Sequence, residues 1–275
     1  MKNYIQKTKN YVQKDSVITF TAFGVVGLYT VFIMLVLGGI LFYTDIPTIW
    51  KNITSSSTLF AIKLSLITSV ITTTLAILVA IPTGYCLSHY NFRGKQIIDI
   101  IIDLPIVLPP LVVGLCLLVF FNTVPGRFIE NNILRFVFSV PGIVLAQFSI
   151  SASFAVIAIK EAFNNLDPRY EQAARTLGCN KVTAFTKVVF PLIKTGIVSG
   201  GVMTWTRAVG EFVPILLLCG AQRGKTEIMP IAIFLEFEVG NIEGAVGLTI
   251  IFLVLSSLYL ALFKNFLLNR AGQKV

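Results

Sequence analysis

The segment DPRYEQAARTLGCNKVTAFTKVVFP, residues 167–191, is polar and charged, although the chain around it is 55% hydrophobic and only 13% charged. Asp167 followed by Pro168 predicts a helix start, because the carboxylate can cap free amides and a proline at the first helical position needs no amide hydrogen. The apolar residues that follow recur at i, i+3, i+4 and i+7 and share one stripe: Tyr170, Ala173, Ala174 and Leu177. Gly178 can adopt the left-handed conformation that ends a helix. We therefore expect a rigid helix of about ten residues, roughly 15 Å long.

A second helix should follow directly. Asn180 can cap its start, and the apolar residues Val182, Phe185 and Val189 lead to Pro191, where the next apolar run begins. Two alanines keep one side of the first helix thin, which suits a helix that lies in a groove of another protein. The alternative is a helix that lies flat on the lipid headgroups. Spacing alone leaves both interpretations open.

The rest of the 275-residue chain has the composition of a polytopic membrane protein, with a mean hydropathy of +0.83. A helix needs about 20 apolar residues to cross the hydrocarbon core. We predict an all-α integral membrane protein whose transmembrane helices lie at 17–43, 59–88, 98–121, 141–160, 192–219 and 244–263. Residues 1–16 and 264–275 then flank a membrane domain, 17–263, and its largest loop is 161–191.

The distribution of lysine and arginine predicts the orientation, because positively charged loops remain in the cytoplasm. With the N-terminus inside, 15 of the 22 Lys and Arg residues lie on the cytoplasmic side, 5 on the outer side and 2, Lys63 and Arg207, within spans. Both termini and the loop 161–191 are therefore expected in the cytoplasm. The net charge of +9 does not indicate nucleic-acid binding, because the basic residues are not gathered on one face or tail.

The cysteine and histidine content argues against a metal site or a disulfide framework. His89 is the only histidine, and no CxxC pair occurs. We expect the four cysteines to be small buried hydrophobic residues: Cys86, Cys116, Cys179 and Cys219. The segment GAQRGKT, residues 220–226, has three residues where a phosphate-binding loop has four, so it does not predict a nucleotide site.

The stretch YEQAARTLGCNKVTAFTKVVFPLI resembles the EAA loop of ABC importer permeases, in which a Glu-Ala-Ala triplet precedes a glycine and then a proline that opens the next span. Ala173, Ala174, Gly178 and Pro191 occupy those places, whereas Gln172 stands where the glutamate is usual. Glu171 is one residue early. The segments DLPIVLPPLVVG, residues 103–114, and TRAVGEFVPILLLCGAQRGKTEIMPIAIF, residues 206–234, are similar to the permeases for molybdate, tungstate and sulfate.

This resemblance implies a type I ABC importer permease fold and a transport subunit, not an enzyme, that moves a tetrahedral oxyanion across the cytoplasmic membrane of a prokaryote. It implies a homodimer around one pathway, two cytoplasmic ABC ATPase subunits and an extracytoplasmic binding protein. The permease itself would hold no cofactor or metal, because ATP and Mg²⁺ would bind the ATPase. The residues that the resemblance assigns to the coupling helix on the ATPase are Tyr170, Glu171, Gln172, Ala173, Ala174, Leu177 and Gly178.

Proline residues in the third span mark a candidate pathway. Pro105, Pro109 and Pro110 remove amide donors and predict a kinked or unwound backbone. Unwound backbone at membrane depth is tolerated only where it is buried or lines a cavity. A pathway-lining role is therefore favoured over a simple kink.

In the fifth span, Arg207 and Glu211 are four residues apart and can pair on one helical face. Gly210 and Pro214 predict a helix break at the same place. The pair is either a positive charge that helps an anion through or a structural ion pair that holds the break, and the second interpretation is favoured. Thr204 is a further candidate for the pathway or gate.

Small residues predict close helix packing in two spans. The second span has hydroxyls along one face, at Ser65, Ser69, Thr72 and Thr73, for which a hydrated path is the alternative. The fifth span has glycines at Gly196, Gly200 and Gly201.

Other classes of function remain as alternatives. An ABC permease for another small solute would share every feature above. A secondary transporter would instead show paired inverted repeats and several intramembrane carboxylates, whereas Glu211 is the one acidic residue deep in a predicted span. A membrane-embedded enzyme lacks a plausible set of catalytic groups.

Overall fold

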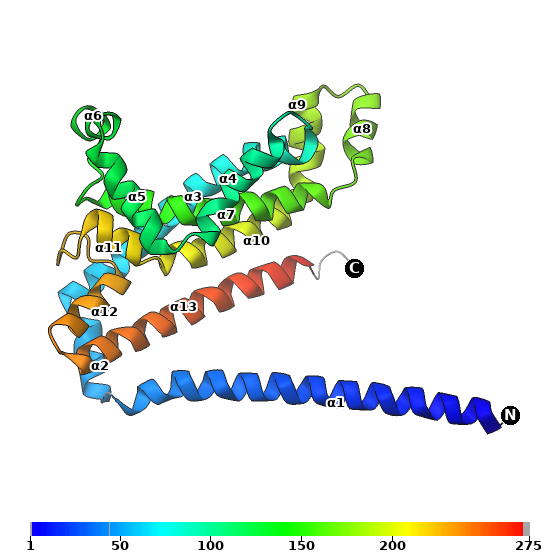
Figure 1. Cartoon of the computed structure of the whole chain (residues 1–275), viewed down its shortest axis with the longest axis horizontal. Helices are drawn as coiled ribbons and strands as arrows, with labels where there is room; N and C mark the ends of the chain where they lie inside the picture. Colours follow the sequence, from blue (N-terminus) through cyan, green and yellow to red (C-terminus); the bar gives the residue numbers. More distant parts are fainter. Residues whose placement is uncertain (1, 44, 272–275) are drawn as a thin grey trace.

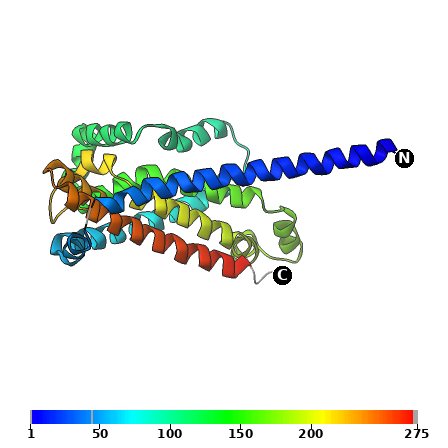
Figure 2. The same ribbon diagram turned by 90° about the horizontal axis from the view of Figure 1, so that it is seen from below.

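The computed structural model describes residues 2–43 and 45–271, and within these ranges the chain is helical, with no strand. Met1 and residues 272–275, which belong to the predicted cytoplasmic ends, lie outside the described residues. The long helices run side by side along one axis (Figures 1 and 2). They are α1 (Lys2–Gly39), α3 (Ser56–His89), α7 (Val140–Asn164), α10 (Phe190–Val209) and α13 (Ile242–Ala271).

Five helices are long and apolar enough to cross a membrane. The predicted number of six spans is reached if a bent pair, α4 (Lys95–Val107) and α5 (Pro110–Asn122), counts as one span. The flanking segments are not separate from the spans, because α1 already begins at Lys2 and α13 continues to Ala271. The predicted fifth span, 192–219, is too long at its end: the helix stops at Val209 and α11 (Val213–Cys219) is a separate element.

Several short helices were not predicted from the sequence. They are α2 (Ile46–Thr54), α6 (Val124–Asn132) and α12 (Met229–Glu238). Figures 1 and 2 show them gathered at the end of the molecule opposite α8 (Arg169–Thr176) and α9 (Lys181–Ala184). The first described part of α1 and the last described part of α13 lie at the α8 end. The segments predicted to be cytoplasmic therefore share one end of the bundle.

Helices α3, α7 and α10 form the centre of the bundle, and small residues allow their backbones to approach closely. A side chain added at Gly200 would lie 3.0 Å from Cβ of Ala158, and one at Gly196 would collide with Ala162. Gly201 faces Ile77 in the same way, at 2.9 Å. The predicted close packing of these glycines is confirmed.

The hydroxyls of α3 also serve packing. Ser65, Ser69 and Thr72 are buried. The Ser65 hydroxyl accepts a hydrogen bond from the backbone amide of Met229 at 2.7 Å, and so caps the start of α12. Thr72 Oγ1 donates to the side-chain oxygen of Gln147 on α7 at 2.9 Å. These two bonds join helices, as the favoured interpretation predicted, whereas the hydroxyls of Ser69 and Thr73 donate to carbonyls of their own helix.

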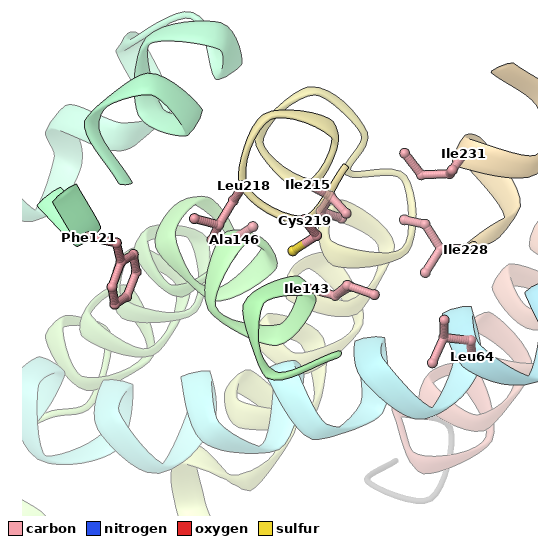
Figure 3. Packing of buried hydrophobic residues seen from close by; sticks show 9 residues of the cluster. All are labelled: Leu64, Phe121, Ile143, Ala146, Ile215, Leu218, Cys219, Ile228 and Ile231. Carbon is pink, nitrogen blue, oxygen red and sulfur yellow. The ribbon is translucent and has the colours of Figure 1, made fainter. Parts of the chain in front are cut away.

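An apolar cluster lies at the end of the bundle where α5, α7, α11 and α12 meet α3 (Figure 3). Its side chains surround Cys219, which is fully buried as predicted. The prediction of burial is wrong for Cys86 and Cys116, which are exposed on the chain, and Cys179 is half-buried. Both exposed cysteines lie in membrane helices, whose outer faces need apolar side chains and not a protein interior.

Helix α1 stands apart from this core. None of the apolar window Thr19–Gly39 is buried inside the chain. Figures 1 and 2 show α1 leaving the bundle as a separate rod. A helix that is apolar all round and uncovered by its own chain is suited to lipid or to a neighbouring protein in the membrane.

Candidate functional site

The predicted helix in the polar loop is present as α8, and its ends are fixed by local chemistry. The helix starts one residue later than predicted, because Pro168 is its N-cap and Arg169 its first residue. The Asp167 carboxylate still accepts a hydrogen bond from the backbone amide of Arg169, at 2.9 Å. At the other end, the backbone amide of Gly178 donates a hydrogen bond to the carbonyl of Arg175, and the amide of Cys179 donates to the carbonyl of Ala174. Gly178 has φ +90°, which L-residues with a side chain rarely adopt. Helix α8 therefore has eight residues, two fewer than predicted, and a firm stop.

The apolar stripe of α8 does not point in one direction, which corrects the prediction of a single thin face. Ala174 keeps 7% of its surface exposed, whereas Leu177 keeps 87%. Tyr170, Gln172 and Ala173 are exposed as well. The stripe lies on the edge of the buried face, so one of its members turns inward while the others remain outside. An external partner would meet Ala173 and Leu177, not Ala174.

Glu171 also turns inward. Its side chain keeps 14% of its surface exposed, and Oε2 lies 3.6 Å from Nε2 of His89, the last residue of α3. The neighbouring Gln172 occupies the outer position of the helix. Glu171 therefore does not replace, on the outer face, the glutamate that is missing at Gln172.

A continuous rod connects this loop to the membrane. The Asn180 side chain accepts a hydrogen bond from the amide of Thr183 at 2.7 Å and caps α9, as predicted. A π-helical turn, η2 (Phe185–Val189), then leads into α10, where Pro191 lies in the first turn. A proline ring collides with the carbonyl four residues earlier, and the wider π turn relieves that collision without ending the helix. Lys181–Val209 is thus continuously helical and, by length and composition, one candidate span.

The third span is broken at its prolines. Helices α4 and α5 meet at an angle of 110°. Leu108 and Pro109 have extended backbones, with ψ 137° and 136°, and Pro110 begins α5. Pro105 lies within the last turns of α4. The predicted unwinding is confirmed, and it follows from the extended conformation that a residue before proline prefers. A role of this break in the pathway stays a prediction.

The predicted pair in the fifth span is also present. Arg207 and Glu211 form an ion pair across the break between α10 and α11. The Glu211 side chain keeps 3% of its surface exposed and that of Arg207 keeps 30%. Thr204 is fully buried, and its hydroxyl donates to the carbonyl of Gly200 within the same helix at 2.7 Å. Thr204 and Arg207 thus lie in the last turns of α10, and Glu211 lies in the break that follows.

Two further polar contacts were not predicted. Lys160 on α7 pairs with Asp99 on α4 at 2.7 Å, and Arg223 pairs with Glu236 of α12 at 2.9 Å. The first pair is 61 residues apart and the second 13 residues apart, and no motif in the sequence links the two members of either pair. The segment 220–226 forms a turn before α12, in which the amide of Gly224 donates to Glu227 at 2.8 Å. That turn is not the strand-to-helix loop of a nucleotide site.

The fold and the polar loop together define a membrane-spanning permease. Residues 73–270 match the family of the binding-protein-dependent transport system inner membrane component, and the chain belongs to this family of ABC importer permeases. It is 34% identical over 230 residues to the molybdenum transport system permease protein ModB of Mycobacterium tuberculosis. The matched region covers 83% of this chain and 87% of that protein. It is 28% identical over 228 residues to the sulfate transport system permease protein CysT of Salmonella typhimurium, with 82% of each chain covered.

A solved structure shares the fold. The crystal structure of a bacterial ABC transporter involved in the import of the acidic polysaccharide alginate has a TM-score of 0.72 at 14% identity. The match covers 98% of this chain and 99% of that chain. The predicted membership in the ABC importer permeases and the predicted all-α fold are confirmed.

Proposed function

We propose that this permease carries a tetrahedral oxyanion, molybdate or tungstate with sulfate as the nearest competitor, across the cytoplasmic membrane of a prokaryote. The observation that supports this substrate class is the 34% identity to a molybdenum permease along 83% of the chain. The same class includes the sulfate permease at 28% identity. An importer for a different small solute is the alternative.

The transporter in this proposal contains two copies of the chain, two ABC ATPase subunits and an extracytoplasmic binding protein. The α8 end of the bundle faces the cytoplasm, which agrees with the predicted excess of basic residues there. ATP and Mg²⁺ bind the ATPase, and the permease binds no cofactor. The permease supplies a pathway and the mechanical link to it.

The link to the ATPase is the outer face of α8. Gln172, Ala173 and Leu177 are exposed, and the caps at both ends of the helix keep it rigid. An exposed leucine beside a small alanine fits a hydrophobic groove, with the leucine as the anchor. Ala174 and Glu171 hold the opposite face against the bundle. A helix lying on lipid headgroups is the alternative for this surface.

Disulfide crosslinking tests the docking face. All four native cysteines are replaced, and one cysteine is introduced at Leu177 in the permease and one in the cleft of the ATPase. We expect a crosslink in the active complex, and the matched variant Ala174→Cys should give little, because that position is buried by the chain itself. Equal crosslinking at both positions, or none at Leu177 in a complex that transports, would count against this face. A fluorescent label on the cysteine at position 177 provides a second readout. Quenching of its fluorescence by a lipid-soluble quencher, to the same extent with and without the ATPase, would favour the headgroup alternative.

Reconstitution tests the substrate class. Proteoliposomes that contain the permease, the ATPase and the binding protein encoded with them should accumulate molybdate only when ATP is present. Calorimetry on the binding protein then ranks molybdate, tungstate and sulfate. Uptake that continues without the ATPase and follows an ion gradient would instead identify a secondary transporter, and failure with all three oxyanions would point to another solute.

A further inference from the structure

The inward side of α8 reaches the end of α3 through charged and aromatic groups. Oε2 of Glu171 lies 3.6 Å from Nε2 of His89, which is the last residue of α3. Tyr85, one turn earlier in α3, stacks on the ring of His89. Glu171 is the first acidic residue of α8, and its side chain is largely buried by this contact.

The imidazole of His89 is held in place by its neighbours. Its Nδ1 lies 2.8 Å from the hydroxyl of Ser88. The ring stacks on Tyr85 with centroids 4.2 Å apart, and Phe163 of α7 packs edge-on at 5.7 Å. A ring fixed on three sides presents its remaining nitrogen in one direction, toward α8. We name Tyr85, His89 and Glu171 the α3–α8 clamp.

The helix after α8 is tied to the same end of α3. The ammonium of Lys181, the first residue of α9, bonds the hydroxyl of Tyr90, which directly follows α3. It also lies 4.8 Å from the centroid of that ring. Phe185 in η2 packs edge-on against Tyr85 at 5.1 Å. Both arms of the α8–α9 hairpin thus contact the end of one membrane helix.

The apolar anchoring of α8 is small by comparison. Among the eight residues of α8, Ala174 is the buried side chain, and burial of an alanine removes little apolar surface from water. The main packing partners of α8 are η2 and α9, which belong to the rod that leads into α10. The clamp is therefore the principal direct connection from α8 to α3.

We propose that the α3–α8 clamp makes the movement of α8 act on two membrane helices at once, on α10 through the covalent rod and on α3 through Glu171. This inference rests on the proposed docking of α8 to an ATPase. Glu171 and His89 are positioning residues in it, because they touch neither ATP nor the transported anion. Rigid elements that move together transmit a displacement, whereas an unclamped α8 would tilt against α3.

The test compares ATP hydrolysis with transport in the reconstituted complex. Glu171→Gln and His89→Gln should each leave assembly and ATP hydrolysis near normal but lower the number of anions imported per ATP by about fivefold, the lower end of typical couplings between sites. The double variant should be no worse than either single variant, because both remove the same contact. A newly introduced ion pair at the same two positions, Glu171→Lys with His89→Glu, should recover part of the ratio.

Controls separate the clamp from the docking surface. Asn164→Ala changes an exposed residue at the end of α7, outside the docking surface, and should leave the import per ATP unchanged. Tyr85→Leu removes the ring that stacks on His89 and provides a second variant if Glu171→Gln assembles poorly. A Leu177 crosslink in the parent complex with an unchanged ratio in all clamp variants would overturn the clamp alone. Absence of that crosslink in an active parent complex would overturn the proposed docking itself.

Discussion

Truncation of Arg207 should destabilise the protein more than truncation of Glu211, although the two side chains form one ion pair. The difference follows from their surroundings, since Glu211 keeps 3% of its side-chain surface exposed and Arg207 keeps 30%. Arg207→Ala leaves a buried carboxylate without its partner, a change that costs about 3–5 kcal/mol in buried pairs. Glu211→Ala leaves a long, partly exposed cation that can reach polar surroundings, so we expect about 1 kcal/mol.

Unfolding of the detergent-purified variants, followed by a thermal or denaturant assay, measures this order. The double variant should be more stable than Arg207→Ala, because it removes the stranded carboxylate as well. Equal losses in the two single variants, or a larger loss in Glu211→Ala, would refute the reasoning. Uptake assays separate the roles: if Glu211→Gln accelerates anion uptake and Arg207→Gln abolishes it at equal stability, the arginine attracts the anion and is not only a structural partner.

Three further changes probe the framework. Gly178→Ala forces a side chain onto a residue with φ +90° and should cost about 1–2 kcal/mol, seen as faster proteolysis of the loop after α8. Gly196→Ala places a methyl group against α7 and should lower the unfolding temperature, whereas the matched change Gly24→Ala, which meets nothing within 4 Å, should not. Ser65→Ala leaves the first amide of α12 buried without its acceptor and should cost about 1–3 kcal/mol of unfolding free energy.

Hydropathy and capping chemistry predicted the long helices, α8 and its glycine stop, because each signal is local. The same signals could not find α2, α6 or α12, since helices of nine or ten residues are too short to register as spans. The break after Val209 was marked by Gly210 and Pro214, but α11 beyond it is apolar and was merged with the span. Composition identifies an apolar segment, not the direction in which it continues.

The orientation of α8 was beyond the sequence for a different reason. Periodicity tells which side chains share a face, but not what lies opposite that face. The stripe that contains Ala174 and Leu177 straddles the boundary between buried and exposed surface, so Ala174 is buried while Leu177 is exposed. His89 lies 82 positions before Glu171, and neither residue type marks the other. Their contact exists only because α3 ends beside the start of α8.

The rod that begins at α9 has a defined end as well as a defined start. Its membrane part, α10, has 20 residues, which at 1.5 Å per residue is about 30 Å, the thickness of the hydrocarbon core. Its far end stops at the break where Arg207 pairs with Glu211, and α11 follows in a new direction. If α8 moves as proposed, the displacement reaches the far end of α10 but need not move α11 by the same amount. In the proposed transporter, the helix break is the place where relative motion between the rod and the outer end of the bundle is concentrated, and the ion pair limits how far it opens.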